Sequence, residues 1–358
     1  MLEYLLRFSI RKSSIIMLVV LALAALGIWN FTKLPIDAVP DITNVQVMIN
    51  TESPGYTPLE VEQRVTYPLE TALAGIPNLI STRSVSRYGL SQVTAIFSDE
   101  TDVYFARQLV NERLLSAKSD LPFGLEPELG PIATGLGEIF MFTVDAEPGA
   151  RNDEGELITA TDLRTVHDWI IRPQLMQVQG VVEVNPIGGF KREILVAFDP
   201  KKLLTFGVSQ QDVIQAIENN NDNKGAGFIE KNGAQWLLRI PGQAKSLKDL
   251  ANIPVKSTNG SVVRISDVAN VGEGKELRTG AATQNGREVV MSTVFMLIGE
   301  NSQRVAKAVG LRLEEVKESL PTGITVTAVY DRTKLVEKTL DTVKMNLIVI
   351  IVFYCLNN

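Results

Sequence analysis

Residues 13–32 read SSIIMLVVLALAALGIWNFT, and residues 33–42 continue with KLPIDAVPDI. The first stretch carries no charge over twenty residues, enough for a helix to cross the ~30 Å hydrocarbon core of a membrane. The second stretch is stiffened by two prolines and carries the chain away from the first. The sequence therefore predicts a membrane span followed by a large tethered body.

The charges around this stretch predict its orientation. Arg7, Arg11 and Lys12 precede the apolar run, whereas acidic residues follow it closely, so the positive-inside rule places the N-terminus in the cytoplasm. A cleaved secretory signal is the alternative, because Ala22-Leu23-Ala24 resembles a cleavage site. The apolar run continues to Phe31, which is longer than a typical signal core, and this favours the membrane span.

Composition narrows the function classes. The chain has 358 residues, which predicts two or three domains, and its net charge of −6 without a basic block argues against a nucleic-acid partner. The chain contains one cysteine, Cys355, and one histidine, His167. It therefore cannot build a thiolate or multi-histidine metal site from its own residues.

The first part of the body is predicted to be a split βαβ unit. Thr57-Pro58-Leu59-Glu60 has the pattern of a capping box with proline at the first helical position, and Pro68 is expected to kink that helix. The expected elements are a strand at 43–51, the capped helix, strands at 79–86 and 90–97, a helix at 102–119 and a proline-rich edge strand within 121–131. Their order is β-α-β-β-α-β, the ferredoxin-like plan.

The same pattern then starts again and is interrupted. A strand at 139–146, a helix at 161–179 and a strand at 181–187 form the first half, and the second half is expected at 288–297, 302–319 and 324–330. The intervening segment 188–277, called the insertion below, is predicted to contain a strand at 193–198, a Ser209-capped helix and a hairpin turning at Asn232-Gly233. An insertion with its own hairpin is expected to serve as a docking surface.

The C-terminal end is apolar only over residues 347–356, about half of a membrane span, and is interpreted as an incomplete second transmembrane helix. The predicted fold class is α+β. The predicted organisation is a cytoplasmic N-terminus at 1–12, transmembrane helix 1 at 13–32, a first subdomain at 37–137, a second at 138–187 and 278–333, the insertion at 188–277 and the incomplete helix at 340–358.

Several motifs resemble one transporter family along nearly the whole chain. They are KLPIDAVPDITNVQV, PGYTPLEVEQRVTYPLE, ATGLGEIF, DLRTVHDWIIRPQLMQVQGVVEVNPIGG, ELRTGAATQNGREVV and YDRTKLVEKTLDTVK. Together they resemble the heavy-metal efflux branch of the resistance-nodulation-division (RND) transporters, most closely the cobalt–zinc–cadmium inner-membrane pumps.

This resemblance implies a proton-driven antiporter of the bacterial inner membrane, with most of its chain in the periplasm. Family members are homotrimers that work with a periplasmic adaptor and an outer-membrane channel. In family terms the chain holds the first transmembrane helix, two ferredoxin-like porter subdomains and the docking subdomain inserted in the second. The family's proton-relay carboxylates lie on a later helix, so the chain is expected to be an N-terminal fragment that does not transport alone.

Glu138, in GLGEIF, is the candidate metal ligand. A divalent ion favours oxygen or imidazole donors, and a carboxylate at the start of a strand supplies one. The resemblance implies that this segment faces the substrate cleft. A solvated glutamate at a strand end is the alternative.

The methionines do not indicate a copper site. Soft thioethers select Cu(I), but Met141, Met291 and Met296 are interpreted as core packing. The resembling copper and silver pumps carry methionine where Leu277 stands and an apolar residue where Glu138 stands. The transported ion, which is cargo rather than a cofactor, is therefore expected to be Zn, Co, Cd or Ni.

Other polar residues are interpreted as structural. His167, beside Asp168, is expected to be a plain surface histidine, and the acidic loop with Asp153, Glu154 and Glu156 a solvated hairpin tip. Gly188-Gly189 is expected to be a turn. The chain shows no nucleophile triad, phosphate loop or dinucleotide fingerprint, so no enzymatic activity is expected.

Two functions stay open from the sequence. The first is part of a divalent-metal RND pump. The second is a membrane-anchored periplasmic interaction module that docks to an adaptor or to pump protomers, partly through the arm at 225–240, without transporting.

Overall fold

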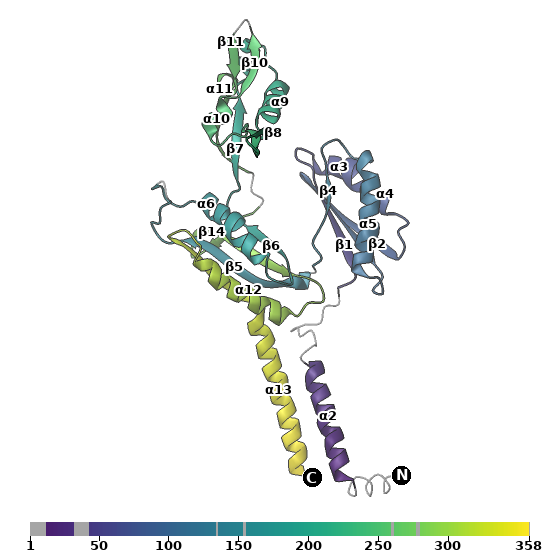
Figure 1. The fold of residues 1–358 in the computed structure, drawn as a ribbon. Helices are drawn as coiled ribbons and strands as arrows, with labels where there is room; N and C mark the ends of the chain where they lie inside the picture. The colour runs from purple at the N-terminus through teal and green to yellow at the C-terminus, as the bar shows by residue number, and fades with distance from the viewer. Residues whose placement is uncertain are drawn as a thin grey trace.

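The protein is described by a computed structural model covering residues 12–31, 43–133, 135–152, 155–258, 261–276 and 280–357. It is a mixed helix and sheet fold with three separate hydrophobic cores, and two long helices extend from the end opposite the insertion (Figure 1). The exit segment 33–42 lies outside the described residues.

The first core belongs to a four-stranded antiparallel sheet in the order β2-β3-β1-β4 with helices on one face. The inward face of β3 places Val93, Ala95 and Phe97 against the helices, as strand alternation requires. The elements of this first sheet unit are β1 (Gln46–Glu52), α3 (Pro58–Val61), η1 (Glu62–Thr66), α4 (Tyr67–Leu73), β2 (Leu79–Arg87), β3 (Leu90–Phe97), α5 (Val103–Ala117), η2 (Lys118–Asp120) and β4 (Pro127–Leu129).

Local signals decide where these elements begin and end. The side-chain oxygen of Thr57 accepts a hydrogen bond from the Glu60 backbone, and the Glu60 carboxylate accepts one from the Thr57 backbone, so the predicted capping box is confirmed. The expected distortion at Pro68 takes the form of a π-helical turn, η1, which ends at Thr66, two residues before the proline. This turn accommodates the backbone N–H donor that proline lacks. The proline-rich edge strand shrinks to three residues, β4.

The second core lies under a sheet in which β14 is central. Its order is β13-β14-β5-β15, with β6 pairing the same edge of β14 as β13, and helices α6 and α12 cover one face. The elements of this second sheet unit are η3 (Gly135–Gly137), β5 (Glu138–Ala146), α6 (Ala160–Val166), η4 (His167–Ile171), α7 (Arg172–Leu175), β6 (Val181–Ile187), β13 (Ala282–Gln284), β14 (Arg287–Met296), α12 (Ser302–Lys317) and β15 (Ile324–Asp331).

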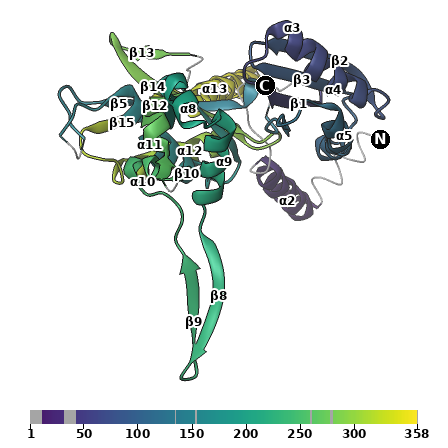
Figure 2. The same cartoon turned by 90° about the horizontal axis from the view of Figure 1, so that it is seen from above.

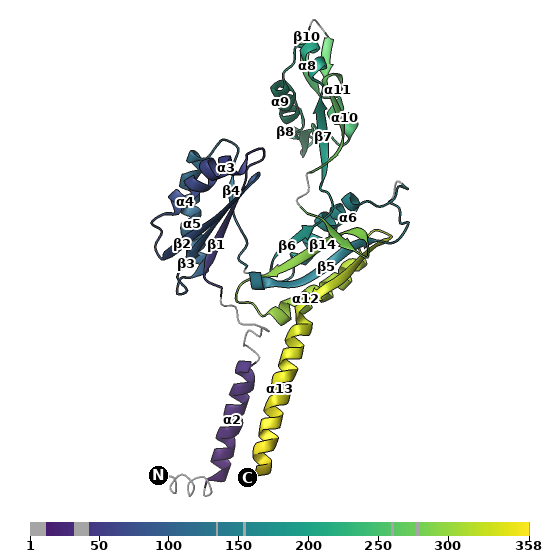
Figure 3. The ribbon, with the colours of Figure 1, turned by 180° about the vertical axis from the view of Figure 1, so that it is seen from behind.

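The insertion forms the third core and stands off from the second sheet unit on a two-stranded ribbon of β7 and β12 (Figures 1 and 3). Its hairpin of β8 and β9, predicted from Asn232-Gly233, projects far from the body (Figure 2). The elements are β7 (Arg192–Phe198), α8 (Pro200–Phe206), α9 (Gln210–Asn220), β8 (Lys224–Lys231), β9 (Ala234–Ile240), α10 (Leu247–Ala251), β10 (Pro254–Thr258), β11 (Ser261–Arg264), α11 (Ile265–Val268) and β12 (Ala269–Lys275).

Two helices lie outside the cores. Helix α2 (Ser13–Phe31) exposes large apolar side chains along its length, and α13 (Arg332–Asn357) continues directly from β15. They extend from the same side of the molecule (Figures 1 and 3). Over the part of the chain that is described, no helix combines the length and apolarity needed to cross a membrane.

Candidate functional site

Glu138 lies at the first position of β5, directly after the short helix η3, and is half-buried. The guanidinium of Arg332, at the start of α13, donates to the carbonyl oxygens of Leu136 and Glu138, the latter at 3.5 Å. A side chain on Gly137 would approach the carbonyl oxygen of Met296 to 3.2 Å. The backbone around Glu138 is therefore held by β14 on one side and by α13 on the other.

A second carboxylate lies in the same row of the sheet. Phe295 on β14 pairs in register with Glu138 on β5 and with Glu183 on β6, so the two glutamates flank it from opposite sides. Adjacent strands are ~4.8 Å apart, which places the two glutamate backbones about 10 Å apart. Sequence reasoning missed Glu183, because 45 positions separate the two residues and only strand pairing brings them to one row.

The structure does not assemble a complete metal site around Glu138. Within the described ranges, no three His, Cys, Asp or Glu side chains are grouped closely enough to hold a metal ion. A carboxylate pair alone supplies too few ligands for Zn²⁺, which takes four in structural sites. Among the described residues, Glu138 is thus a single carboxylate without a finished coordination shell around it.

The three methionines divide between two faces of the second sheet. Met296 is buried in the core, as predicted. Met141 and Met291 are half-buried and alternate with Phe142 and Val290, which point into the core. Both methionines therefore face away from α6 and α12, and the expectation that they pack in the core was wrong. Leu277, the other position used to compare metal preference, lies outside the described residues.

His167 is fully buried, so the expectation of a surface histidine was wrong. It lies on the π-helical turn η4, and its ring stacks on Phe142 with the centroids 6.1 Å apart. Leu163, His167, Ile171 and Leu175 recur at four-residue spacing and are all buried. That spacing was the available signal, since it places the histidine on the apolar face of its helix.

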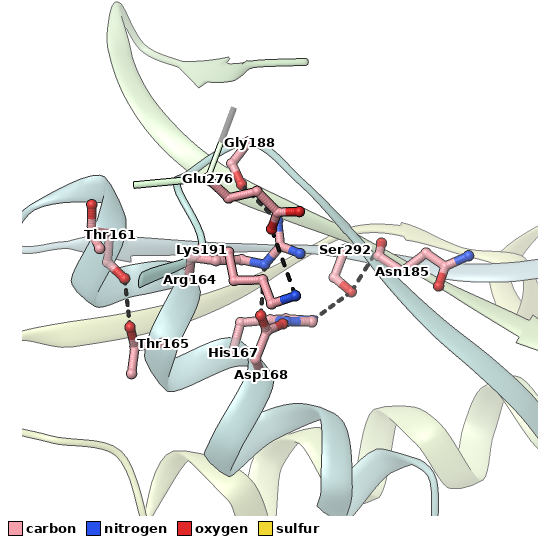
Figure 4. Close-up of polar contacts among 10 residues, drawn as sticks. All are labelled: Thr161, Arg164, Thr165, His167, Asp168, Asn185, Gly188, Lys191, Glu276 and Ser292. Carbon is pink, nitrogen blue, oxygen red and sulfur yellow. Dashed lines mark hydrogen bonds and ion pairs between the residues drawn. The ribbon is translucent and has the colours of Figure 1, made fainter. Parts of the chain in front are cut away.

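The buried ring joins a chain of polar contacts (Figure 4). Its Nδ1 lies 2.8 Å from Asp168 Oδ1, and its Nε2 lies 2.9 Å from the hydroxyl of Ser292 on β14. The other oxygen of Asp168 accepts from Nε of Arg164 at 2.8 Å, and Nη1 of Arg164 lies 3.4 Å from the carbonyl oxygen of Gly188. These contacts therefore connect the central strand β14 to the point where the insertion leaves the second sheet unit.

Burial and charge determine the protonation of this network. Burial lowers the pKa of His167, against the hydrogen bond and charge of Asp168, and the cations of Arg164 and Arg172 lower it further. Burial alone raises the pKa of Asp168, but hydrogen bonds from His167 and Arg164 and the Arg164 charge outweigh it, so the pKa is lowered. An ionised Asp168 only accepts, so the neutral ring carries its proton on Nδ1 and accepts at Nε2 from Ser292.

The order Asp168, His167, Ser292 resembles a nucleophile triad but is not arranged for catalysis. The Ser292 side chain is completely buried, and its oxygen also lies 3.4 Å from the carbonyl oxygen of Asn185. A nucleophile needs access to its substrate, and this hydroxyl has none. The network holds η4 against β14.

An open groove of about 480 Å³ runs beside the network, lined in part by Arg164, Trp169, Arg172, Arg192 and Ile194. Its cations are largely paired with carboxylates, as in the 2.7 Å contact between Arg192 and Asp162. The groove is therefore not a free basic patch.

The expected acidic loop is only partly described. Asp153 and Glu154 lie outside the described residues, and the backbone N–H of Glu156 donates to the side chain of Asn152 at 2.9 Å. This contact closes the loop locally, as expected for a turn.

The chain is similar to one transporter family and to several metal resistance proteins. The model of the AcrB/AcrD/AcrF family matches residues 5–357. The cobalt-zinc-cadmium resistance protein CzcA of Cupriavidus metallidurans is 54% identical over 364 residues, covering 100% of this chain and 34% of that protein. The nickel-cobalt-cadmium resistance protein NccA of Alcaligenes xylosoxydans xylosoxydans is 41% identical over 388 residues, covering 100% of this chain and 36% of that protein.

A solved structure agrees with these relatives. An X-ray crystal structure of a heavy metal efflux pump matches with a TM-score of 0.84 and 29% sequence identity, covering 96% of this chain and 34% of that chain. The chain thus spans about a third of the length of the proteins it matches. It belongs to the AcrB/AcrD/AcrF family, in the heavy-metal efflux branch of the RND transporters.

Proposed function

We propose that this chain is the part of a proton-driven RND efflux pump that receives divalent metal ions and docks to its partner proteins. The observation that carries the proposal is the 54% identity, over the whole chain, to a cobalt-zinc-cadmium resistance protein. The favoured cargo is Zn, Co, Cd or Ni. Glu138 in place of an apolar residue supports divalent over monovalent ions, because carboxylate oxygen suits harder cations.

The three cores suggest a division of labour. We assign 37–137 to the first porter subdomain, 138–187 with 278–333 to the second, and 188–277 to docking. The support is that buried residues form three clusters that share no member.

The membrane assignment is part of the proposal. We place residues 13–32 across the bacterial inner membrane with 1–12 in the cytoplasm, and assign 340–358 to a second transmembrane helix, with the body between them in the periplasm. The charge-free run at 13–32 and the exposed apolar side chains of α2 support this, since such a surface favours lipid over water. The expected partners are two further copies, a periplasmic adaptor and an outer-membrane channel.

We propose that Glu138 is one ligand of the transported ion, with its remaining ligands supplied from outside this chain. Support comes from its strand-end position and from the backbone contacts that hold it.

The test is Glu138→Gln in the intact pump, scored by resistance of a pump-deleted host to zinc, cobalt and cadmium. Glutamine keeps the size and removes the charge that binds a cation. The matched control is Glu128→Gln, an exposed glutamate on β4 of the first sheet unit. Loss of resistance with Glu138→Gln alone supports the ligand role, and equal resistance of both variants contradicts it.

A specific surface favours the alternative, an interaction module that does not transport. The hairpin of β8 and β9 exposes four large apolar side chains, Phe228, Ile229, Trp236 and Leu237. Exposed apolar surface of this kind marks a protein interface. Recovery of adaptor or pump subunits with the chain, without metal resistance in any assembly, would favour this alternative over transport.

A further inference from the structure

The insertion shares no core with the unit that carries it. Its buried residues, such as Val213 and Ile265, form a cluster separate from that of the second sheet unit. Two chain segments connect the units, one that leads into β7 and one that follows β12. An isolated pair of strands is only marginally stable in water. Contacts at the root of the insertion therefore help to set the direction in which it points.

The root carries two polar contacts to helix α6. Nη1 of Arg164 lies 3.4 Å from the carbonyl oxygen of Gly188, and Nη2 of Arg192 on β7 lies 2.7 Å from Asp162 Oδ1. The other oxygen of Asp162 accepts from the backbone of Thr159 at 2.8 Å and caps α6. Asp162 therefore ties the insertion to the start of a helix that is itself fixed by its cap.

Close backbone packing reinforces these contacts. Gly189 has a φ of +66°, and a Cβ there would meet the carbonyl oxygen of Ala160 at 2.6 Å and Cβ of Arg164 at 2.9 Å. A Cβ on Gly188 would meet the carbonyl oxygen of Val289 at 2.7 Å. The root is thus wedged between α6 and β14, where only glycine fits.

The buried histidine supports the arginine. Asp168 holds Nε of Arg164, which leaves Nη1 free to reach Gly188, and His167 holds the second oxygen of Asp168 while bonding to Ser292 (Figure 4). Each hydrogen bond to an ionised group in this series of contacts is charge-assisted, and it fixes the geometry better than a hydrogen bond between neutral groups. The position of the guanidinium is therefore dictated by the central strand.

The first sheet unit offers an internal comparison. There the π-helical turn η1 also bonds to the adjacent strands, through Thr66 to Ser91 and Ser86, both at 2.8 Å. The strands β2 and β3 are joined by the short turn at Tyr88 and Gly89, without an insertion. Both units thus fasten a π-helical turn to the sheet, but only the one bearing the insertion extends this link through Asp168 and Arg164.

We propose that Arg164, positioned by His167 and Asp168, and Asp162, paired with Arg192, form a lock that holds the insertion in one orientation on the second sheet unit. In this lock Arg164 and Asp162 are positioning residues. The lock determines where a partner bound to the insertion sits relative to the porter subdomains, whichever partner that is.

The experiment measures the orientation directly in the full chain in detergent. Spin labels at Glu218→Cys on α9 and Glu314→Cys on α12, in a Cys355→Ser background, report the distance between the insertion and the second sheet unit. Both label sites are exposed. We expect one narrow distance with the lock intact, and loss of that single distance in Arg164→Gln combined with Arg192→Gln.

A conservative pair of variants separates the lock from general stability. Arg164→Lys with Arg192→Lys keeps both charges, but lysine lacks the planar fork with which the Arg164 guanidinium contacts Asp168 through Nε and Gly188 through Nη1. We expect the single distance to be lost here too, while hydrogen exchange of β5 and β14 stays as in the parent. Thr66→Val, which alters the equivalent link in the first sheet unit, should leave the distance unchanged. An unchanged narrow distance in both arginine pairs, or the same broadening in Thr66→Val, would overturn the proposal.

Discussion

Two buried serines allow the helix-to-strand link to be measured against an internal control. Ser292 on β14 and Ser91 on β3 are both completely buried, and each bonds to a side chain on a π-helical turn. The same substitution, serine to alanine, removes one hydroxyl from each. The two sites differ in whether the bonded side chain on the π-helical turn keeps another hydrogen-bond partner after the substitution.

The expected magnitudes follow from the remaining partners. After Ser292→Ala, Nε2 of His167 is left without its hydroxyl donor in a buried site, which costs about 1–3 kcal/mol. After Ser91→Ala, Thr66 keeps Ser86 at 2.8 Å, so the loss is that of one ordinary hydrogen bond, about 0.5–1.5 kcal/mol. We therefore expect Ser292→Ala to be the more damaging change.

Hydrogen exchange of the full chain in detergent is the suitable assay, because three separate cores need not unfold together. Protected amides of β14 and β3 report each unit on its own. Since 1.4 kcal/mol corresponds to a factor of ten, Ser292→Ala should speed exchange in β14 by roughly five- to a hundredfold. The effect of Ser91→Ala in β3 should be several times smaller.

A double-mutant cycle makes the prediction stricter. His167→Phe keeps an aromatic ring against Phe142 but removes the nitrogen that accepts a hydrogen bond from the Ser292 hydroxyl. In that background Ser292→Ala should cost little, which corresponds to a coupling energy of about 1–2 kcal/mol. The reasoning is refuted if Ser292→Ala costs the same with histidine and with phenylalanine at 167, or if Ser91→Ala is at least as damaging.

Two further predictions concern pH and the root of the insertion. Burial lowers the pKa of His167 in the folded state below its ordinary ~6.5. At pH values between the lowered pKa and ~6.5 the unfolded chain binds more protons than the folded chain, so the stability of the second sheet unit should fall as pH decreases. Exchange of β14 against pH measures this, and His167→Phe should flatten the dependence; an unchanged slope would contradict it. Gly189→Ala should destabilise the same unit by about 2–4 kcal/mol, since a positive φ and the contact with Ala160 both oppose a side chain. Gly207→Ala, also at positive φ but in open space, should cost only about 1 kcal/mol, and equal losses would refute the packing argument.

Features with local causes were predictable from the sequence. The capping box at Thr57, the helix cap at Ser209 and the hairpin turn at Asn232-Gly233 appear as expected. Each depends on hydrogen bonds or backbone angles within about four residues, so neighbouring residue types suffice. The alternation of strands and helices followed in the same way from hydrophobic periodicity.

The insertion was less predictable. Its strand β7 and helix α9 were expected, but β10, β11 and the return strand β12 were not. Strand β12 reads ANVGEGK, with two glycines and little apolar alternation, and it becomes a strand because β7 is available to pair along its whole length. Strand formation of this kind depends on a partner 70 or more residues away, which a local pattern does not reveal.

The sequence by itself determined the order of elements in the two sheet units, the family and a candidate ligand, Glu138, because these depend on motifs and periodicity along the chain. Only the tertiary structure decided that His167 is buried and bonded to Ser292, 125 positions away, and that Glu183 shares a row with Glu138. The physical reason is the same in both cases. Burial and strand register arise from packing between segments distant in the chain, and the same residue types are compatible with a surface or a core until that packing is formed.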